Sequence, residues 1–228
     1  MKNPNQLISI IIPVFNESES IGYLLDEVLN VMQNNKFNCE LIVVNDGSND
    51  NTSTVLDELT IKIKELSVIS LRKNYGQTAA MAAGFDNSKG EIVITLDGDL
   101  QNDPNDIPKL ISHINEGYDL ICGWRYERKD KLINRRIPSK IANKLIANVT
   151  GLKLHDYGCS LKAFKKEIVD DIKLYGELHR FLPVLANIEG AKIKEIKVNH
   201  RSRKYGSSKY GIDRTFRVLM DLLTVWFM

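Results

Sequence analysis

Two aspartates separated by one glycine, Asp97-Gly98-Asp99, have the residue types and spacing that most directly indicate chemistry. They follow the apolar run 92–96, which predicts a strand that is buried on both faces of a sheet. Open α/β sheets bind their ligands at the carboxyl ends of their strands. Two carboxylates at such an end suit Mg²⁺ or Mn²⁺ that also carries substrate phosphates. A lone D-x-D is more often only a polar turn, so the rest of the chain must decide between the two interpretations.

The elements that must position these aspartates alternate between strand and helix patterns. Such alternation predicts an α/β fold, a Rossmann-like and mostly parallel sheet flanked by helices. A serine at position 18 is the expected N-cap of the first helix. The predicted strands span residues 7–14, 41–44, 68–71, 92–96, 119–123 and 192–199, and the predicted helices span 21–32, 52–65, 79–85, 104–116, 138–149 and 179–188.

Acidic residues also follow the first two predicted strands. No G-x-G-x-x-G follows the first strand, which excludes a dinucleotide-binding fingerprint there. Pro13, Phe15 and Glu17 stand at that position instead, and Asp46 follows the second strand. Carboxylates at these ends are well placed to accept hydrogen bonds from a base or a ribose.

Basic residues are concentrated in two regions, although the net charge of the chain is only +2. That small net charge predicts no nucleic-acid partner. The first basic region lies between residues 125 and 144, and the second between residues 197 and 217. Local basic patches suit phosphates or an anionic membrane surface. The glycine- and serine-rich stretch 200–210 predicts a mobile loop that contacts phosphate.

The last stretch of the chain, 215–228, is increasingly apolar and contains Trp226 and Phe227. It suits either a buried terminal helix or a helix at a membrane interface. The sequence has no apolar run long enough to cross a bilayer and no signal-peptide pattern at its start. Three widely spaced cysteines indicate buried thiols in a reducing compartment.

Eight motifs are distributed along nearly the whole chain: IIPVFNE, VVNDGSNDNT, RKNYGQTAAMAAGF, ITLDGDLQNDP, GWR, DYGCSLKAF, ELHRF and RKYGSSKY. They resemble those of the family 2 glycosyltransferases with the GT-A fold. Among them, DYGCSLKAF and the late basic loop most resemble the polyprenyl-phosphate glycosyltransferases, the group of dolichol-phosphate mannose synthase and the undecaprenyl-phosphate sugar transferases.

This resemblance implies roles for individual residues. Asp97 and Asp99 would bind Mg²⁺ or Mn²⁺, with Asp97 beside the nucleotide, and Gln101 would lie near the sugar. Asp156 would act as a base or orient the acceptor. Base and ribose would contact Pro13, Phe15, Glu17 and Asp46, and the donor diphosphate or the lipid phosphate would contact Arg125, Arg201, Arg203, Ser208 and Lys209.

The resemblance also implies an inverting transfer of a hexosyl unit from a nucleoside diphosphate sugar, with UDP favoured, to a polyprenyl phosphate. Residues 1–211 would form the catalytic domain, and 212–228 would form an amphipathic, apolar terminal helix that suits the membrane interface. The protein would be cytoplasmic and peripheral on the inner face of the cell membrane, alone, as a homo-oligomer or with a membrane-protein partner. Two alternatives stay open: a transferase for a soluble or cell-surface glycan, and an inactive nucleotide-binding subunit.

Overall fold

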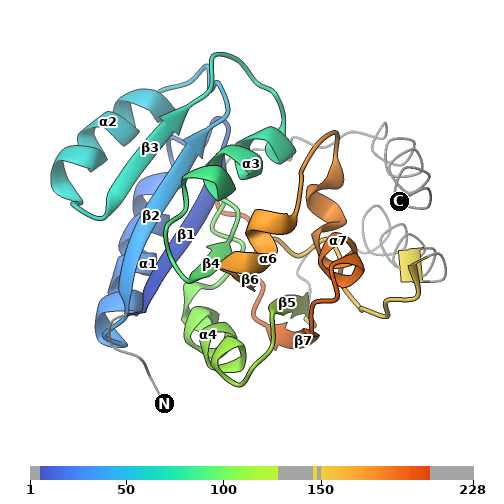
Figure 1. Ribbon diagram of the computed structural model, residues 1–228. Coiled ribbons are helices and arrows are strands. Elements are labelled where there is room, and N and C mark those ends of the chain that lie inside the picture. The colour runs from blue at the N-terminus through green and yellow to red at the C-terminus, as the bar shows by residue number, and fades with distance from the viewer. Residues whose placement is uncertain (1–5, 128–145, 148–149, 206–228) are drawn as a thin grey trace.

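The computed structural model describes residues 6–127, 146–147 and 150–205, and in this part of the chain one sheet organises the fold (Figure 1). Its seven strands run in the order β3-β2-β1-β4-β6-β5-β7. The strands are β1 (Leu7–Val14), β2 (Asn38–Asn45), β3 (Leu66–Ser70), β4 (Ile92–Thr95), β5 (Leu120–Arg125), β6 (Lys162–Lys165) and β7 (Ile193–Val198). The predicted α/β fold with a mostly parallel sheet is therefore confirmed.

Helices cover both faces of the sheet, and in Figure 1 α3 and α6 cross the front while α1 lies behind. One face packs on α1 (Ile21–Asn34), α2 (Thr52–Lys62) and α4 (Ile107–Asn115). The other face packs on α3 (Gln77–Asn87), α6 (Lys166–Asp171) and α7 (Leu182–Ile188). Two 3-10 helices, η1 (Pro104–Asp106) and η3 (Leu178–Arg180), precede α4 and α7. None of the described helices has the length and apolar composition needed to cross a membrane.

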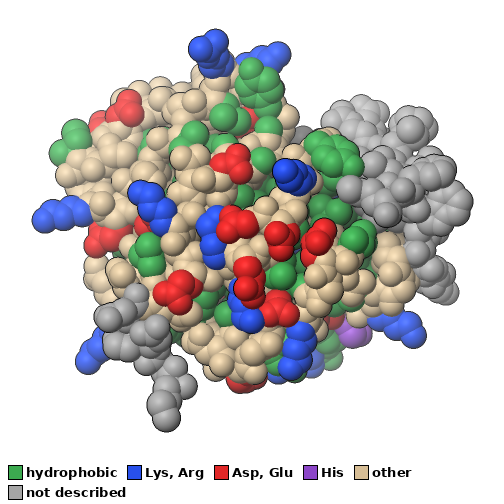
Figure 2. Space-filling model, in the orientation of Figure 1, with side chains coloured by type: hydrophobic (Ala, Val, Ile, Leu, Met, Phe, Trp, Pro, Cys, Tyr) green, Lys and Arg blue, Asp and Glu red, His purple; other side chains and the backbone are tan. Residues whose placement is uncertain are grey.

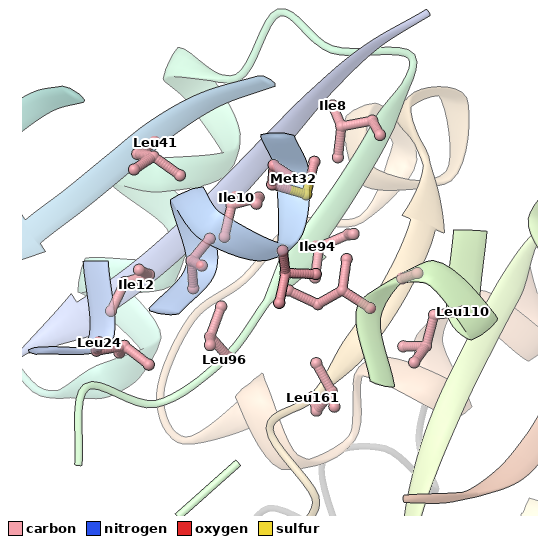
Figure 3. Packing of buried hydrophobic residues seen from close by; sticks show 14 of the residues in the cluster. Ile8, Ile10, Ile12, Leu24, Met32, Leu41, Ile94, Leu96, Leu110 and Leu161 are labelled. Atoms are coloured by element: carbon pink, nitrogen blue, oxygen red, sulfur yellow. The ribbon is translucent and has the colours of Figure 1, made fainter. Parts of the chain in front are cut away.

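The centre of the sheet is β1, whose side chains are buried on both faces. Figure 3 shows Ile8, Ile10 and Ile12 pointing toward α1, where Met32 lies in the same hydrophobic cluster. Ile11 points to the opposite face and packs with α3. Because both faces are covered, this strand is a continuous apolar run rather than an alternating one.

Strand β6 was not predicted from the sequence. It is four residues long and pairs antiparallel with both β4 and β5. It begins with a buried lysine, Lys162, which breaks the apolar pattern that marks the other strands. This segment is extended because it pairs with strands that are distant in the sequence, so its local residue pattern did not predict a strand.

Several element boundaries differ from those predicted. The helix predicted from residue 104 begins as η1 and becomes α-helical at Ile107. The first helix begins at Ile21, so its N-cap position is Ser20. The hydroxyl of Ser18 donates instead to Asp50 at 2.8 Å, which ties the turn after β1 to the turn after β2.

Some predictions fall outside the described residues. They concern most of the basic stretch 125–144, most of the predicted helix 138–149, Ser208, Lys209, and the boundary between domains 1–211 and 212–228. Residues 146 and 147 of that helix are described, and they are helical.

The face drawn in Figure 2 carries a group of exposed acidic side chains over α6. Glu167, Asp170 and Asp171 belong to it. Lys165 and Lys166 lie among them and pair with Asp119 and Asp170. This face therefore offers paired, mainly acidic groups rather than a basic patch.

Replacing the fully buried Ile10 with Ala should lower the free energy of unfolding by about 2–5 kcal/mol, because it leaves a cavity between β1 and α1. Urea unfolding followed by circular dichroism measures this change. Ile61→Ala is the matched control, because Ile61 is 87% exposed, and it should cost less than about 0.5 kcal/mol. Equal losses in the two variants would contradict the assigned core.

Candidate active site

The D-x-D turn lies directly after β4 and against the end of β1. These two strands pair in parallel, so the chain leaves both at the same edge of the sheet. A Cβ atom on Gly98 would lie only 2.7 Å from Cγ1 of Val14 and 3.6 Å from Cγ of Glu17. The glycine therefore allows the turn to approach β1 closely, which brings its two aspartates near the predicted nucleotide-binding residues.

Asp99 is a buried carboxylate held by two donors. Its Oδ1 accepts the backbone N–H of Gln101 at 3.0 Å, and its Oδ2 accepts a hydrogen bond from the guanidinium of Arg203. The pKa of Asp99 is raised to about 6, mainly by burial and then by the neighbouring Asp97 carboxylate, while Arg203 opposes this rise. The side chain is therefore an acid that depends on a nearby cation to stay ionised at neutral pH.

Asp97 is fixed by groups that the sequence interpretation did not single out. Its Oδ1 accepts a hydrogen bond from Nε2 of Gln77, the first residue of α3, at 2.7 Å. Its backbone N–H donates to Oδ1 of the buried Asn102 at 3.3 Å. Asn102 also accepts the hydroxyl of Ser160 at 2.8 Å. Gln77 lies in the motif RKNYGQTAAMAAGF and Asn102 in ITLDGDLQNDP, but nothing in their spacing indicates these contacts.

The ends of β1 and β2 provide the predicted nucleotide-binding residues. Pro13 and Phe15 are partly buried, and Oε1 of Glu17 lies 3.8 Å from Nη1 of Arg203. The two oxygens of Asp46 accept the backbone N–H groups of Tyr75 and Gly76 at 2.7 and 2.9 Å. Burial raises the pKa of Asp46, and these hydrogen bonds oppose that rise. Asp46 thus also fixes the turn that leads into α3.

A second charged pair lies at the end of β5. Arg125 donates to both oxygens of Asp156, with Nε at 2.7 Å and Nη2 at 2.8 Å. Asp156 is only 2% exposed. A Cβ atom on Gly158 would lie 3.4 Å from Nη2 of Arg125, so this glycine keeps the space beside the guanidinium open. Bidentate geometry fixes the plane of the arginine.

The segment after β7 closes one side of the site with its basic residues. Its backbone at Arg201 donates to the carbonyl of Gln101 at 2.8 Å, while the Arg201 guanidinium bonds Glu27 at 2.6 Å and Asp103 at 2.7 Å. Tyr205 stacks on Tyr23 of α1, with the ring centroids 6.0 Å apart. The segment thereby carries Arg203 to Asp99.

The structure therefore groups most of the predicted site residues into two clusters, while Pro13, Phe15 and Asp46 lie at the ends of β1 and β2. Asp156 and Arg125 form the smaller cluster at β5, linked to Asn102 through the nearby Ser160. Ser208 and Lys209 lie outside the described residues. The larger cluster contains Glu17, Asp97, Asp99, Gln101, Arg201 and Arg203.

The described residues contain no group of three or more His, Cys, Asp or Glu side chains that could hold a metal ion by themselves. Asp97, Asp99 and Glu17 are nevertheless close enough to influence one another electrostatically. Carboxylates of this kind fit a cation that takes only one or two ligands from the protein and the others from phosphates.

A family model described as glycosyl transferase family 2 matches residues 9–173. The chain belongs to this family. Dodecaprenyl-phosphate galacturonate synthase of Rhizobium johnstonii is 47% identical over 226 residues, which cover 96% of this chain and 66% of the relative. Undecaprenyl-phosphate 4-deoxy-4-formamido-L-arabinose transferase of Proteus mirabilis is 40% identical, over 95% of this chain and 67% of the relative. The chain thus spans about two thirds of the length of these relatives.

The solved structures support the same fold for this member of glycosyl transferase family 2. Glucosyl-3-phosphoglycerate synthase from Mycobacterium tuberculosis, crystallised with Mn²⁺ and uridine-diphosphate-glucose, matches with a TM-score of 0.75 and 19% identity. The match covers 98% of this chain and 80% of that chain. The names of the two sequence relatives confirm the resemblance to polyprenyl-phosphate glycosyltransferases.

Replacing Arg203 with Gln should raise the pKa of Asp99 above about 6, because it removes the cation that favours the ionised carboxylate. Titration of the carboxyl ¹³C signal by NMR measures this pKa. Lys36→Gln removes an exposed charge at the far end of α1 and should leave the pKa unchanged. An unchanged or lower pKa in the Arg203 variant would show that this pair does not control Asp99.

Proposed function

We propose that this protein transfers a glycosyl unit from a UDP-sugar to a polyprenyl phosphate, with inversion at the anomeric carbon. The observation that carries the proposal is the meeting of Asp97 and Asp99 with Glu17 and Arg203 at the edge where β1 and β4 end. Acidic groups there suit a metal-bound diphosphate, and the arginine suits its developing charge. The names of the sequence relatives support polyprenyl phosphate as the acceptor.

Asp99, assisted by Asp97, would hold Mg²⁺ or Mn²⁺ against the donor diphosphate. The bound cation would neutralise charge on the leaving diphosphate. Arg203 donates to Asp99 in the structure, so we expect its guanidinium to turn to the diphosphate when the carboxylate takes a metal. Arg201 would stay beside it, because Glu27 and Asp103 hold its guanidinium from two sides.

Pro13, Phe15, Glu17 and Asp46 would bind the base and the ribose. The partly buried ring of Phe15 offers an apolar contact for the base. Each Asp46 oxygen already accepts one backbone N–H, and a carboxylate oxygen can accept a second hydrogen bond. The same residue can therefore hold the turn at residues 75–76 and meet a ribose hydroxyl.

Arg125 would bind the acceptor phosphate, and Gln101 would lie near the transferred sugar. A phosphate monoester has a second pKa of about 6, so it is largely ionised at neutral pH and needs no strong base to become a nucleophile. Asp156 has both oxygens on Arg125. We therefore infer that Asp156 acts through Arg125 by fixing the plane of its guanidinium, rather than as a proton acceptor. Ser208 and Lys209 would add donors for phosphate.

A polyprenyl acceptor would place the protein on the inner face of the cell membrane as a peripheral protein. A membrane-protein partner or a second copy of the chain would then assist in handling the lipid product. The proposed helix 212–228 beside the membrane belongs to the same proposal.

An assay with radiolabelled UDP-sugars, Mn²⁺ and a short-chain polyprenyl phosphate should yield a lipid-linked sugar. UDP-galacturonate, UDP-glucose and a UDP-linked 4-formamido-arabinose are the donors to compare. Asp99→Ala should reduce turnover by more than about 100-fold, since it removes the group that holds charge against the leaving diphosphate. The variant Asp57→Ala alters an exposed acid on α2 and is the control. Transfer only to soluble glycans would support the glycan-acceptor alternative, and no turnover with any donor would support an inactive subunit.

Asp156→Asn distinguishes a positioning role from a general base. If Asp156 orients Arg125, we expect the KM for polyprenyl phosphate to rise and kcat to fall by less than about 100-fold, with an unchanged pH profile. Loss of a general base would instead cost about 100- to 10,000-fold in kcat and remove the acidic limb of the profile. Steady-state kinetics between pH 5 and 9 measure both quantities, and the second result would restore Asp156 as the base.

A further inference from the structure

The residues on either side of Arg125 form an aromatic and basic patch at the end of β5. Arg125 turns toward Asp156, while Trp124 and Tyr126, one position before and one after it, lie together with their ring centroids 5.0 Å apart. The backbone turns directly after the strand, where the N–H of Tyr126 donates to the carbonyl of Trp124 at 2.8 Å, and this turn keeps the two rings together. Tyr126 is 56% exposed.

Neighbouring elements hold this patch in place. His155 stacks on Trp124 with the centroids 4.0 Å apart and the planes at 14°, and its Nδ1 lies 2.7 Å from Oε2 of Glu195. Lys197 stands opposite Trp124 in the β5–β7 register. Its Nζ lies 3.8 Å from the centroid of Tyr126 and 5.6 Å from that of Trp124. The rings and the ammonium are therefore organised before any partner binds.

We propose that Trp124, Tyr126 and Lys197 form a docking patch for the headgroup layer of an anionic lipid membrane. Tryptophan and tyrosine favour the boundary between water and bilayer, because their rings have an apolar body and a polar edge. A lysine ammonium beside them is attracted to anionic headgroups. The inference rests on the proposed function, because it explains how Arg125 reaches a phosphate that is fixed to a lipid.

Charge distribution favours this side of the molecule for contact with the membrane. The chain continues from the patch into residues 128–144, which contain seven Lys and Arg residues and one Asp. The face over α6 carries the exposed acids Glu167, Asp170 and Asp171, which an anionic surface would repel (Figure 2). The docking patch also lies at the carboxyl end of β5, at the same edge as the D-x-D turn. A membrane on this side would therefore present its phosphates to the site.

Fluorescence of Trp124 tests the proposal without substrate or turnover. The chain has two tryptophans, Trp124 and Trp226, so Trp226→Phe leaves Trp124 as the single reporter. Vesicles of phosphatidylcholine with phosphatidylglycerol should shift its emission to the blue, and brominated phosphatidylcholine in the same vesicles should quench it. Sedimentation of the protein with vesicles while Trp124 emission stays unshifted and unquenched would overturn the proposal. Failure to sediment with anionic vesicles would overturn it as well.

Two matched double variants test whether binding to vesicles depends on the docking patch rather than on exposed residues elsewhere. Tyr126→Ser with Lys197→Gln should weaken binding to anionic vesicles by at least about fivefold, the loss expected for one lysine near such a surface. Tyr175→Ser with Lys173→Gln alters an exposed tyrosine and lysine after α6 and should leave binding unchanged. Equal binding of the two double variants would overturn the proposal.

The vesicle measurements and the transfer assay can be made on the same protein, so failure of the docking patch can be distinguished from failure of the proposed function. The vesicle measurements contain neither donor nor acceptor, so an inactive protein can still pass them. A protein that glycosylates short-chain polyprenyl phosphate in detergent but fails both vesicle tests would retain the proposed function and lose the docking patch.

Discussion

Burial of acidic side chains at the edge of the sheet is the constraint on which the site depends. Asp99 lies in the interior beside Asp97 and Glu17, so burial first, and then repulsion from these two acids, raises its pKa. An uncompensated buried charge costs several kcal/mol, so a cation must come close. Arg203 supplies that cation from a segment about one hundred residues further along the chain. The carboxylate of Asp99, which would serve a substrate, therefore also determines where the segment after β7 packs.

Contacts other than the pair between Arg203 and Asp99 also hold the segment after β7 in place. Asn199 donates to Asp103 and Asp106, and Arg201 bonds both the backbone of Gln101 and the side chain of Glu27. These contacts join β7, η1 and α1 around the D-x-D turn. Charges held by several neighbours are preorganised, which is the property that favours stabilisation of a developing negative charge.

Strand β6 connects the two clusters of the site. It lies antiparallel between β4 and β5, so the segment before it passes the ends of both strands. In that segment Ser160 donates to Asn102 and accepts from Thr95 through its carbonyl, while Asp156 holds Arg125. One short strand therefore sets the separation between Asp97 and Asp99 on one side and Arg125 on the other. Arg125 in turn divides the β5 end into a polar side and the aromatic side of Trp124.

The sequence by itself determined the layered α/β fold, the family and the residues at the strand ends. Apolar runs such as β1 are determined locally, because burial on both faces requires nearly every residue to be apolar. Asp97, Asp99 and Glu17 followed from the rule that ligands bind at the carboxyl ends of strands. The motifs were specific enough to indicate polyprenyl-phosphate transferases, which the sequence relatives support.

Only the tertiary structure decided which of these charges meet. Strand β6 starts with a buried lysine and has little local pattern of its own, so pairing with β4 and β5 makes it a strand. The pairing of Asp156 with Arg125, the donation of Gln77 to Asp97 and the approach of Arg203 to Asp99 all join residues at least 20 positions apart. Their energies depend on burial and distance, and neither quantity exists until the chain has folded.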